Sequence, residues 1–152
     1  MLSVGSKAPD FALKGSDGNM YSLKDFSAKY IVLYFYPKDD TPGCTIEAKG
    51  FSSQKDEFAG LDIDVVGVSS DDYNSHCRFV QKYGLNLLLL SDPGSEAIKS
   101  YEAYANRGIF GWGTVRKTFV LGKERNIIMI YPKVNPEGHE KEILEFIKKQ
   151  KD

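Results

Sequence analysis

The chain has 152 residues, of which 41% are hydrophobic and 27% are charged, and its formal net charge at pH 7 is −1. The length suits one domain over residues 1–152, and the balanced charge gives no reason to expect a nucleic-acid or membrane-surface partner. No apolar run approaches a membrane span, the N-terminal MLSVGSKAPDF lacks a signal-peptide core, and two cysteines are too few for a disulfide scaffold, so we expect a cytoplasmic protein.

The first half of the chain alternates predicted strands and helices. Two short strands are expected on either side of the turn-forming residues 16–19. Residues 30–36, YIVLYFY, are apolar at both alternating sets of positions, which indicates a strand buried on both faces. A helix is predicted over residues 45–58 and a second buried strand over residues 62–69. The succession of strand, helix and strand indicates a right-handed parallel unit.

The second half begins with a helix that Asp71 and Asp72 can cap and that Gly84 can end. Further helices are expected over residues 95–104 and from about residue 137 onward. Strands are expected over residues 87–90, 116–121 and 127–131, the last two as an antiparallel hairpin. Residues 106–113, NRGIFGWG, are predicted to form a glycine-rich loop with exposed aromatic side chains.

The order of these elements predicts an α/β protein with a thioredoxin-like fold. A parallel β–α–β half is followed by a β–β–α half, which gives a central mixed sheet with helices on both faces and an N-terminal β-hairpin extension. The fold alone says little about function, because function depends on the site that the fold carries.

Cys44 stands directly after Pro42 and Gly43, in the first turn of a predicted helix. Free backbone N–H groups and the positive end of the helix dipole favour a thiolate at such a position, and the thiolate is the nucleophilic form. The hydroxyl of Thr41 could hydrogen-bond the thiolate or a small oxygenated substrate. The alternative is that Cys44 is a small buried hydrophobic residue and that Thr41 makes an ordinary turn bond.

Other uses of cysteine fit this sequence less well. The chain contains no C-x-x-C motif, which disfavours a dithiol oxidoreductase. A papain-like protease needs a histidine base, and the only histidines are His76 and His139. A zinc site would lack any close pair of ligands except His76 and Cys77. We therefore expect neither a metal nor a cofactor.

The segment YPKDDTPGCTIE, residues 36–47, contains the pattern P-x-x-x-T-x-x-C and resembles the peroxiredoxins. It is most similar to the branch called peroxiredoxin Q or bacterioferritin comigratory protein. VGSKAPDFALKGSDG, SHCRFVQKYGLNLLLLSD and VRKTFVLGKERNI are also similar to segments of that branch, so the resemblance covers most of the chain. It implies a thiol peroxidase that reduces hydrogen peroxide and organic hydroperoxides.

The resemblance also implies roles for four residues. Cys44 is the expected peroxidatic cysteine, and Thr41 and Pro37 are expected to shape its pocket. Arg116 is expected to stabilise the thiolate and the charge that develops as the peroxide bond breaks. The sequence alone leaves open that Arg116 is a solvated charge at the end of a strand.

Glu47 and Tyr36 could belong to the same network, or they could be a first-turn helix acid and a core aromatic residue.

Reaction with peroxide leaves a sulfenic acid, which a second thiol usually resolves. Many members of the branch carry that thiol at the position of Lys49 here.

Cys77 is the other cysteine, on a helix face with Tyr73 and Val80. Some members of the branch place the resolving cysteine in this helix, which implies a disulfide between Cys44 and Cys77. Because the neighbours of Cys77 are apolar, both helices should open locally before the sulfurs meet. The alternative is that Cys77 only packs in the core and that Cys44 works as a single cysteine.

The family expectation for the reductant is thioredoxin or a related dithiol protein, and the expected assembly is a monomer or a weak homodimer. Two other classes of function are a peroxide sensor that uses the same cysteine and a non-catalytic adaptor. A complete set of Pro37, Thr41, Cys44 and Arg116 argues against the adaptor.

Overall fold

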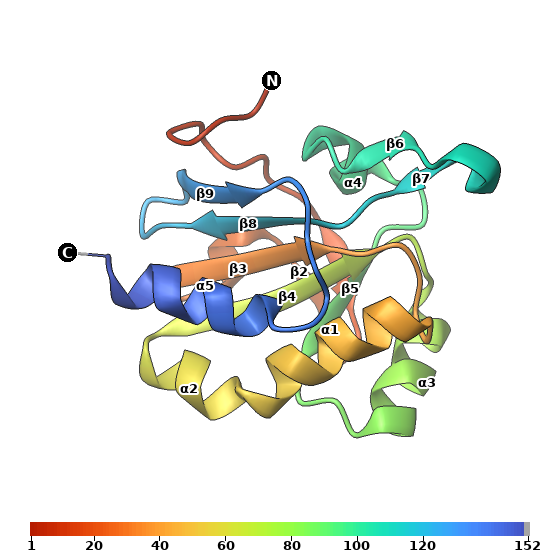
Figure 1. Ribbon diagram of the computed structural model, residues 1–152, viewed down its shortest axis with the longest axis horizontal. Helices are drawn as coiled ribbons and strands as arrows, with labels where there is room; N and C mark the ends of the chain where they lie inside the picture. The colour runs from red at the N-terminus through yellow and green to blue at the C-terminus, as the bar shows by residue number, and fades with distance from the viewer. Residues whose placement is uncertain (151–152) are drawn as a thin grey trace.

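The computed structural model describes residues 1–150 and contains one seven-stranded mixed sheet in the order β2-β1-β5-β4-β3-β8-β9 (Figure 1). Its centre is three parallel strands, β3 (Tyr30–Phe35), β4 (Ile63–Ser69) and β5 (Leu88–Ser91). β8 (Lys117–Leu121) runs antiparallel to β3 and forms a hairpin with β9 (Ile127–Tyr131). The predicted thioredoxin-like fold with a mixed sheet is therefore confirmed.

The N-terminal hairpin extension is also present. β1 (Leu13–Gly15) and β2 (Met20–Tyr21) pair antiparallel around the predicted turn, and β1 joins the edge of the main sheet beside β5. All six residues of β3 are buried, as expected for a strand covered on both faces.

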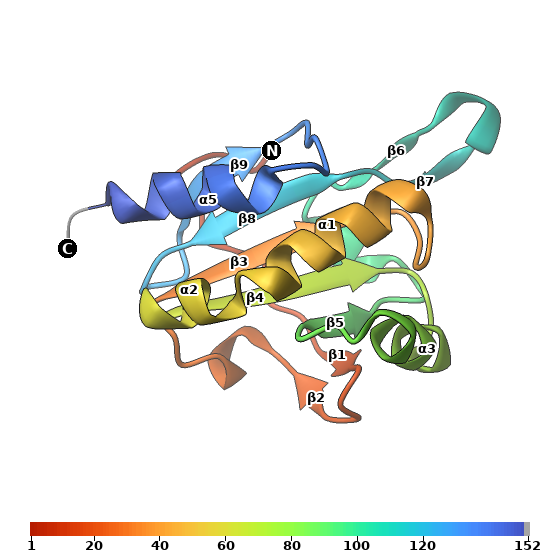
Figure 2. The same cartoon turned by 60° about the horizontal axis from the view of Figure 1, so that its bottom comes forward.

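The helices cover both faces of the sheet. One face carries four helices, α1 (Pro42–Ser53), α2 (Lys55–Gly60), α3 (Tyr73–Tyr83) and α5 (His139–Lys148). The other carries α4 (Glu96–Ser100) and a short 3-10 helix, η1 (Leu23–Asp25). Figure 2 shows α1, α2 and α5 lying along the sheet, with α3 beside the start of α1.

Three elements differ from the sequence predictions. The helix predicted over residues 45–58 starts earlier, at Pro42, and is broken at Gln54, which has a φ of −105° and a ψ of 18°. The hydroxyl of Ser53 donates to the carbonyl oxygen of Gly50 at 2.9 Å. Such a bond offers the backbone an alternative to the helical pattern and weakens the helix at this point.

Of the helix predicted over residues 95–104, only the short α4 forms. Glu102 adopts a left-handed φ of 60°, which ends the helix. The predicted glycine-rich loop is instead a two-stranded ribbon of β6 (Tyr104–Asn106) and β7 (Trp112–Thr114), joined by the 3-10 helix η2 (Gly108–Phe110). The ribbon projects from the body in Figure 2, and its aromatic side chains are exposed as expected.

The predicted end signals of α3 are confirmed. The carboxylate of Asp72 accepts the backbone N–H of Ser75 at 2.8 Å, and Gly84 has the left-handed φ of 60° that an αL cap requires. Among residues 1–150 no helix combines the length and the apolar character that crossing a bilayer requires.

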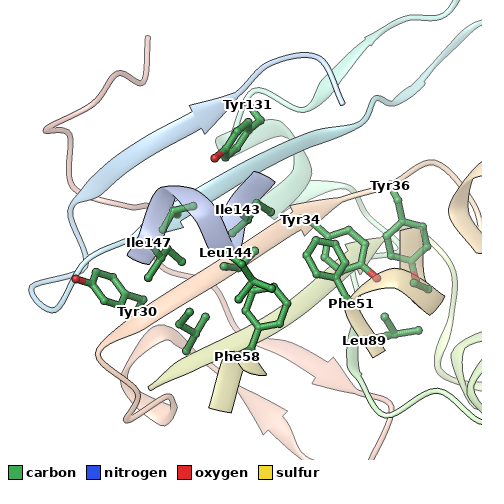
Figure 3. Packing of buried hydrophobic residues seen from close by; sticks show 14 of the residues in the cluster. Tyr30, Tyr34, Tyr36, Phe51, Phe58, Leu89, Tyr131, Ile143, Leu144 and Ile147 are labelled. Atoms are coloured by element: carbon green, nitrogen blue, oxygen red, sulfur yellow. The ribbon is translucent and has the colours of Figure 1, made fainter. Parts of the chain in front are cut away.

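The core layer beneath α1, α2 and α5 is built on aromatic rings (Figure 3). Tyr34 from β3 stacks on Phe51 from α1, with ring centroids 4.6 Å apart, and Phe58 from α2 extends the cluster. Cys44 belongs to the same buried cluster. The start of α1 is therefore fixed against β3 by packing as well as by its own hydrogen bonds.

His139, the first residue of α5, is a buried polar link between the helix and the sheet. Its Nε2 lies 2.8 Å from the hydroxyl oxygen of Thr118 in β8, and its Nδ1 lies 2.6 Å from a carboxylate oxygen of Glu142. Burial lowers the pKa of His139 below its usual value, and Glu142 opposes this shift only in part.

We predict that His139→Gln lowers the free energy of unfolding by about 1–3 kcal/mol at about pH 8, because the Thr118 hydroxyl loses a well-placed partner. The folded-state pKa of His139 is depressed, so its contribution is complete above the unfolded pKa of about 6.5 and is lost as the pH falls through the folded value. Urea unfolding of both proteins from about pH 8 to about pH 5 should therefore give a shrinking difference. A difference independent of pH would contradict this account.

Candidate active site

Cys44 is the third residue of α1, and its side chain is buried, with 1% of the residue exposed. Thr41 is the N-cap in extended conformation, and Pro42 occupies the first helical position, where its missing N–H costs no hydrogen bond. The helix has no acidic residue in its first turn that would oppose a thiolate. The structure thus places Cys44 at the positive end of a helix, as predicted from the sequence.

The guanidinium of Arg116 lies against this helix start. A Cβ atom built on Gly43 would stand 2.5 Å from Nη2 of Arg116, so the close approach requires glycine at this position. Arg116 is the residue before β8, and it reaches the first turn of α1 because β8 pairs with β3. The sequence alone could not distinguish this placement from that of a solvated charge.

Glu47 holds Arg116 in this position. Its Oε1 accepts a hydrogen bond from Nη1 of Arg116 at 3.1 Å, while its Oε2 is buried without a hydrogen-bond partner. Glu47 is one helical turn after Cys44, on the buried face of α1. Burial raises the pKa of Glu47 to about 7, even though the charge of Arg116 and the hydrogen bond to it act in the opposite direction.

The hydroxyl of Thr41 donates to the carbonyl oxygen of Lys38 at 2.8 Å. Its hydrogen is therefore engaged, and its lone pairs remain available to accept a hydrogen bond from a bound O–H group. Pro37 follows the end of β3 and is half-buried. These two residues belong to the loop that leads from β3 to the start of α1.

Tyr34 is a site neighbour that the sequence analysis missed. Its hydroxyl is buried without a hydrogen-bond partner, and burial, with smaller effects of Glu47 and Cys44, holds the pKa of Tyr34 well above its usual value. The alternation of β3 could have indicated this placement, because Tyr34 and Tyr36 share one face of the strand.

Tyr36 is a buried member of the aromatic core cluster, which is one of the two roles that the sequence left open. Its hydroxyl donates to Oδ1 of Asp39 at 2.6 Å, and Asp39 in turn faces His76. Asp39, Asp71 and His76 bring three possible metal-ligand atoms within 4.8 Å of one another. These atoms already make hydrogen bonds to one another, to neighbouring side chains or to the backbone N–H of Asp39. They therefore form a closed polar network rather than an open metal site.

Cys77 lies on α3 and is only partly buried. Its Sγ is 3.6 Å from the carbonyl oxygen of Ser16, in the turn between β1 and β2. A hydrogen bond with this thiol raises the pKa of the neighbouring Tyr73. Both Cys44 and Cys77 are free thiols.

The arrangement brings a thiol, a helix start and a guanidinium together at the carboxyl ends of the parallel strands, where α/β sheets commonly bind ligands. Such a site can stabilise negative charge that develops on a small oxygenated substrate.

The chain is also similar to known proteins. Residues 4–149 match the AhpC/TSA family. Peroxiredoxin Bcp from Bacillus subtilis is 41% identical over 150 residues, which cover 97% of this chain and 96% of that protein.

Two solved structures are also similar to this chain. A mutant of PrxQ from Xylella fastidiosa has a TM-score of 0.93 at 29% identity and covers 97% of this chain and 96% of its own. The bacterioferritin comigratory protein of Xanthomonas campestris, a structure concerned with its alkyl peroxide reduction activity, has a TM-score of 0.89 at 30% identity, with 96% and 98% coverage.

We predict that Gly43→Ala slows the reaction of Cys44 with hydrogen peroxide by at least about tenfold while the fold stays intact. The added Cβ would displace the flexible end of Arg116, and a charge-assisted hydrogen bond contributes roughly 1.5–3 kcal/mol. Rapid-mixing kinetics of the reduced protein measure the rate.

Gly60→Ala is the matched control, because a Cβ at Gly60 meets nothing within 4 Å. Arg116→Met should produce a loss of similar size, and combining it with Gly43→Ala should add little. A full additional loss in the double variant, or a normal rate in Gly43→Ala, would show that the two residues do not act together.

Proposed function

Because the chain belongs to the AhpC/TSA family and is a peroxiredoxin of the Bcp or peroxiredoxin Q type, an enzyme that reduces peroxides with a cysteine thiol, we propose that Cys44 is its peroxidatic residue. The observation that carries this assignment is the contact of Arg116 with Gly43 at the helix start that holds Cys44. We further propose that residues 1–152 act as a single thioredoxin-like domain.

In the proposed first step the thiolate sulfur of Cys44 attacks the terminal oxygen of a hydroperoxide. A sulfur–oxygen bond forms, the oxygen–oxygen bond breaks, and an alkoxide or hydroxide leaves and takes up a proton. Arg116 stabilises the negative charge as it moves across the breaking bond. Because the Thr41 hydroxyl donates to Lys38, it orients the peroxide by accepting its O–H. Pro37, which lies in the same loop as Thr41, helps to exclude water from the site.

Glu47 and Tyr36 act as supports in this proposal. Glu47 fixes Arg116 through the 3.1 Å bond, and the carboxyl is only partly ionised near pH 7 because of its raised pKa. Tyr36 acts less directly, since its hydroxyl bonds to Asp39.

The sulfenic acid on Cys44 is then resolved by Cys77, which is the only other thiol of the chain. The partial exposure of Cys77 supports this role, and because Cys77 must leave its contacts with Ser16 and Tyr73 to react, we propose that α3 moves first. The second candidate is a one-cysteine enzyme in which Cys77 only packs against the β1–β2 turn.

We infer that both hydrogen peroxide and organic hydroperoxides are substrates, as the similarity to the peroxiredoxin Q branch implies. The family implies a thiol reductant, and we propose thioredoxin or a related dithiol protein. We also propose a cytoplasmic location and a monomer or weak homodimer.

The first prediction is that Cys44→Ser abolishes peroxidase activity and leaves the circular dichroism spectrum unchanged. A hydroxyl at this position is not ionised near neutral pH and cannot replace the thiolate. Peroxide consumption with a dithiol-protein reductant is the assay. Substantial turnover by the purified variant would remove Cys44 from the mechanism.

The second prediction concerns Cys77→Ser. Peroxide should convert the wild type to an intramolecular Cys44–Cys77 disulfide, whereas the variant should stop at sulfenic acid or proceed to sulfinic acid. Steady-state turnover with a dithiol-protein reductant should fall, while the initial attack on peroxide keeps its rate. Mass spectrometry and rapid-mixing kinetics measure the two effects.

Wild-type turnover by Cys77→Ser, together with no disulfide in the oxidised wild type, would favour the one-cysteine mechanism. A wild-type protein that oxidises once and does not turn over with any thiol reductant would instead favour a peroxide sensor.

A further inference from the structure

The loop that leads to Cys44 is tied to the helix that carries Cys77 by one buried carboxylate. Oδ2 of Asp39 accepts the hydroxyl of Ser75 at 2.7 Å and lies 2.7 Å from Nδ1 of His76, both on α3. Oδ1 accepts the hydroxyl of Tyr36 at 2.6 Å. Asp39 is 7% exposed, so these bonds are shielded from water.

His76 has no solvent exposure and bonds through both ring nitrogens. Its Nε2 is 3.0 Å from the carbonyl oxygen of Leu90 in β5, a group that can only accept. Its Nδ1 faces the Asp39 carboxylate. The Asp39 carboxylate is therefore held to α3 by a short contact with His76 that is shielded from water.

The backbone of Asp39 is held as well. Its N–H donates to Oδ2 of Asp71 at 2.8 Å, and that oxygen also accepts the hydroxyl of Ser69 at 2.7 Å. The network therefore fixes the end of the β3 loop to the ends of β4 and β5 and to the first turns of α3.

Asp40 makes a second connection to α3, but this one is exposed to solvent. Its carboxylate bonds to Lys82 at 2.7 Å and to Tyr83 at 2.5 Å, near the end of α3. Exposed ion pairs usually contribute little, whereas removing one partner from a buried hydrogen-bonded network is costly. The two neighbouring aspartates thus provide a matched comparison.

His76 directly precedes Cys77, and Cys77 faces Ser16 rather than Cys44. A disulfide requires the two sulfurs to approach bonding distance, so the Cys44 loop and α3 must change their relative position. Such a movement strains or breaks the Asp39–His76 contact. The clamp formed by Asp39, Ser75 and His76 is therefore placed where it opposes the resolving movement.

We propose that Asp39 is a positioning residue that, through Ser75 and His76, sets the rate at which the Cys44 sulfenic acid is resolved by Cys77. This inference rests on the proposed resolving role of Cys77. Resolution forms a sulfur–sulfur bond and releases water from the sulfenic hydroxyl and the thiol hydrogen of Cys77. The competing reaction with a second hydroperoxide gives sulfinic acid and an alcohol, so a tighter clamp increases overoxidation.

The test is Asp39→Asn, which keeps the size of the side chain and removes its charge. Reduced protein is mixed with hydrogen peroxide, quenched at intervals and analysed by mass spectrometry for sulfenic acid, disulfide and sulfinic acid. Disulfide formation should quicken by at least about fivefold, and the fraction overoxidised per turnover should fall by a similar factor. Amide exchange in the reduced protein should quicken at the starts of α1 and α3.

Asp40→Asn is the control and should change the rate of disulfide formation by less than about twofold. Ser75→Ala removes one bond to Asp39 and should accelerate disulfide formation by about twofold to threefold, which keeps the test valid if Asp39→Asn folds poorly. A residue that only supported the fold would slow the resolving step when replaced, or leave it unaltered.

Two results would overturn the inference in different ways. If the wild type forms the Cys44–Cys77 disulfide but Asp39→Asn and Ser75→Ala form it no faster than Asp40→Asn, the clamp does not set the rate and the proposed function stands. If the wild type forms no such disulfide, both the resolving role of Cys77 and the inference fail.

Discussion

The contact between the Arg116 guanidinium and the first turn of α1 is the interaction on which the site depends. It requires glycine at position 43, and it is held by a bond to the buried Glu47. Burial raises the pKa of Glu47 to about 7, against the opposing effect of Arg116. The guanidinium therefore lies between a buried carboxyl and the helix start that carries Cys44.

The sheet explains why these groups meet. β3 ends at the loop that leads through Thr41 into α1 and Cys44, and its antiparallel neighbour β8 begins beside that end, which places Arg116 there. The parallel neighbour β4 ends on the same side and leads into α3, which carries Cys77 (Figures 1 and 2). Residues far apart in the chain are therefore brought to one edge by strand order, while the aromatic core fixes the depth of α1.

Much of this could be predicted from the sequence, because the buried strands and the caps of α3 have strong local signals. The place of Cys44 in the first turn of a helix follows from Pro42 and Gly43, and the resemblance of residues 36–47 to the peroxiredoxins is long enough to identify the family. The break at Gln54 and the β6–β7 ribbon were not predicted, because a side-chain bond and a left-handed residue decide them. The contact of Arg116 and the network of Asp39 depend on strand pairing, which local patterns do not encode.

We propose that electrostatics, and not exposure, selects the cysteine that reacts first. Cys77 is the more exposed thiol, whereas Cys44 is buried at the helix start and directly follows Gly43, which Arg116 approaches closely. The most direct measurement treats the reduced protein with one equivalent of hydrogen peroxide in the presence of a sulfenic-acid trapping reagent and maps the labelled peptide by mass spectrometry. The account predicts label on Cys44 and none on Cys77. Label on Cys77 first, or equally on both cysteines, would contradict it.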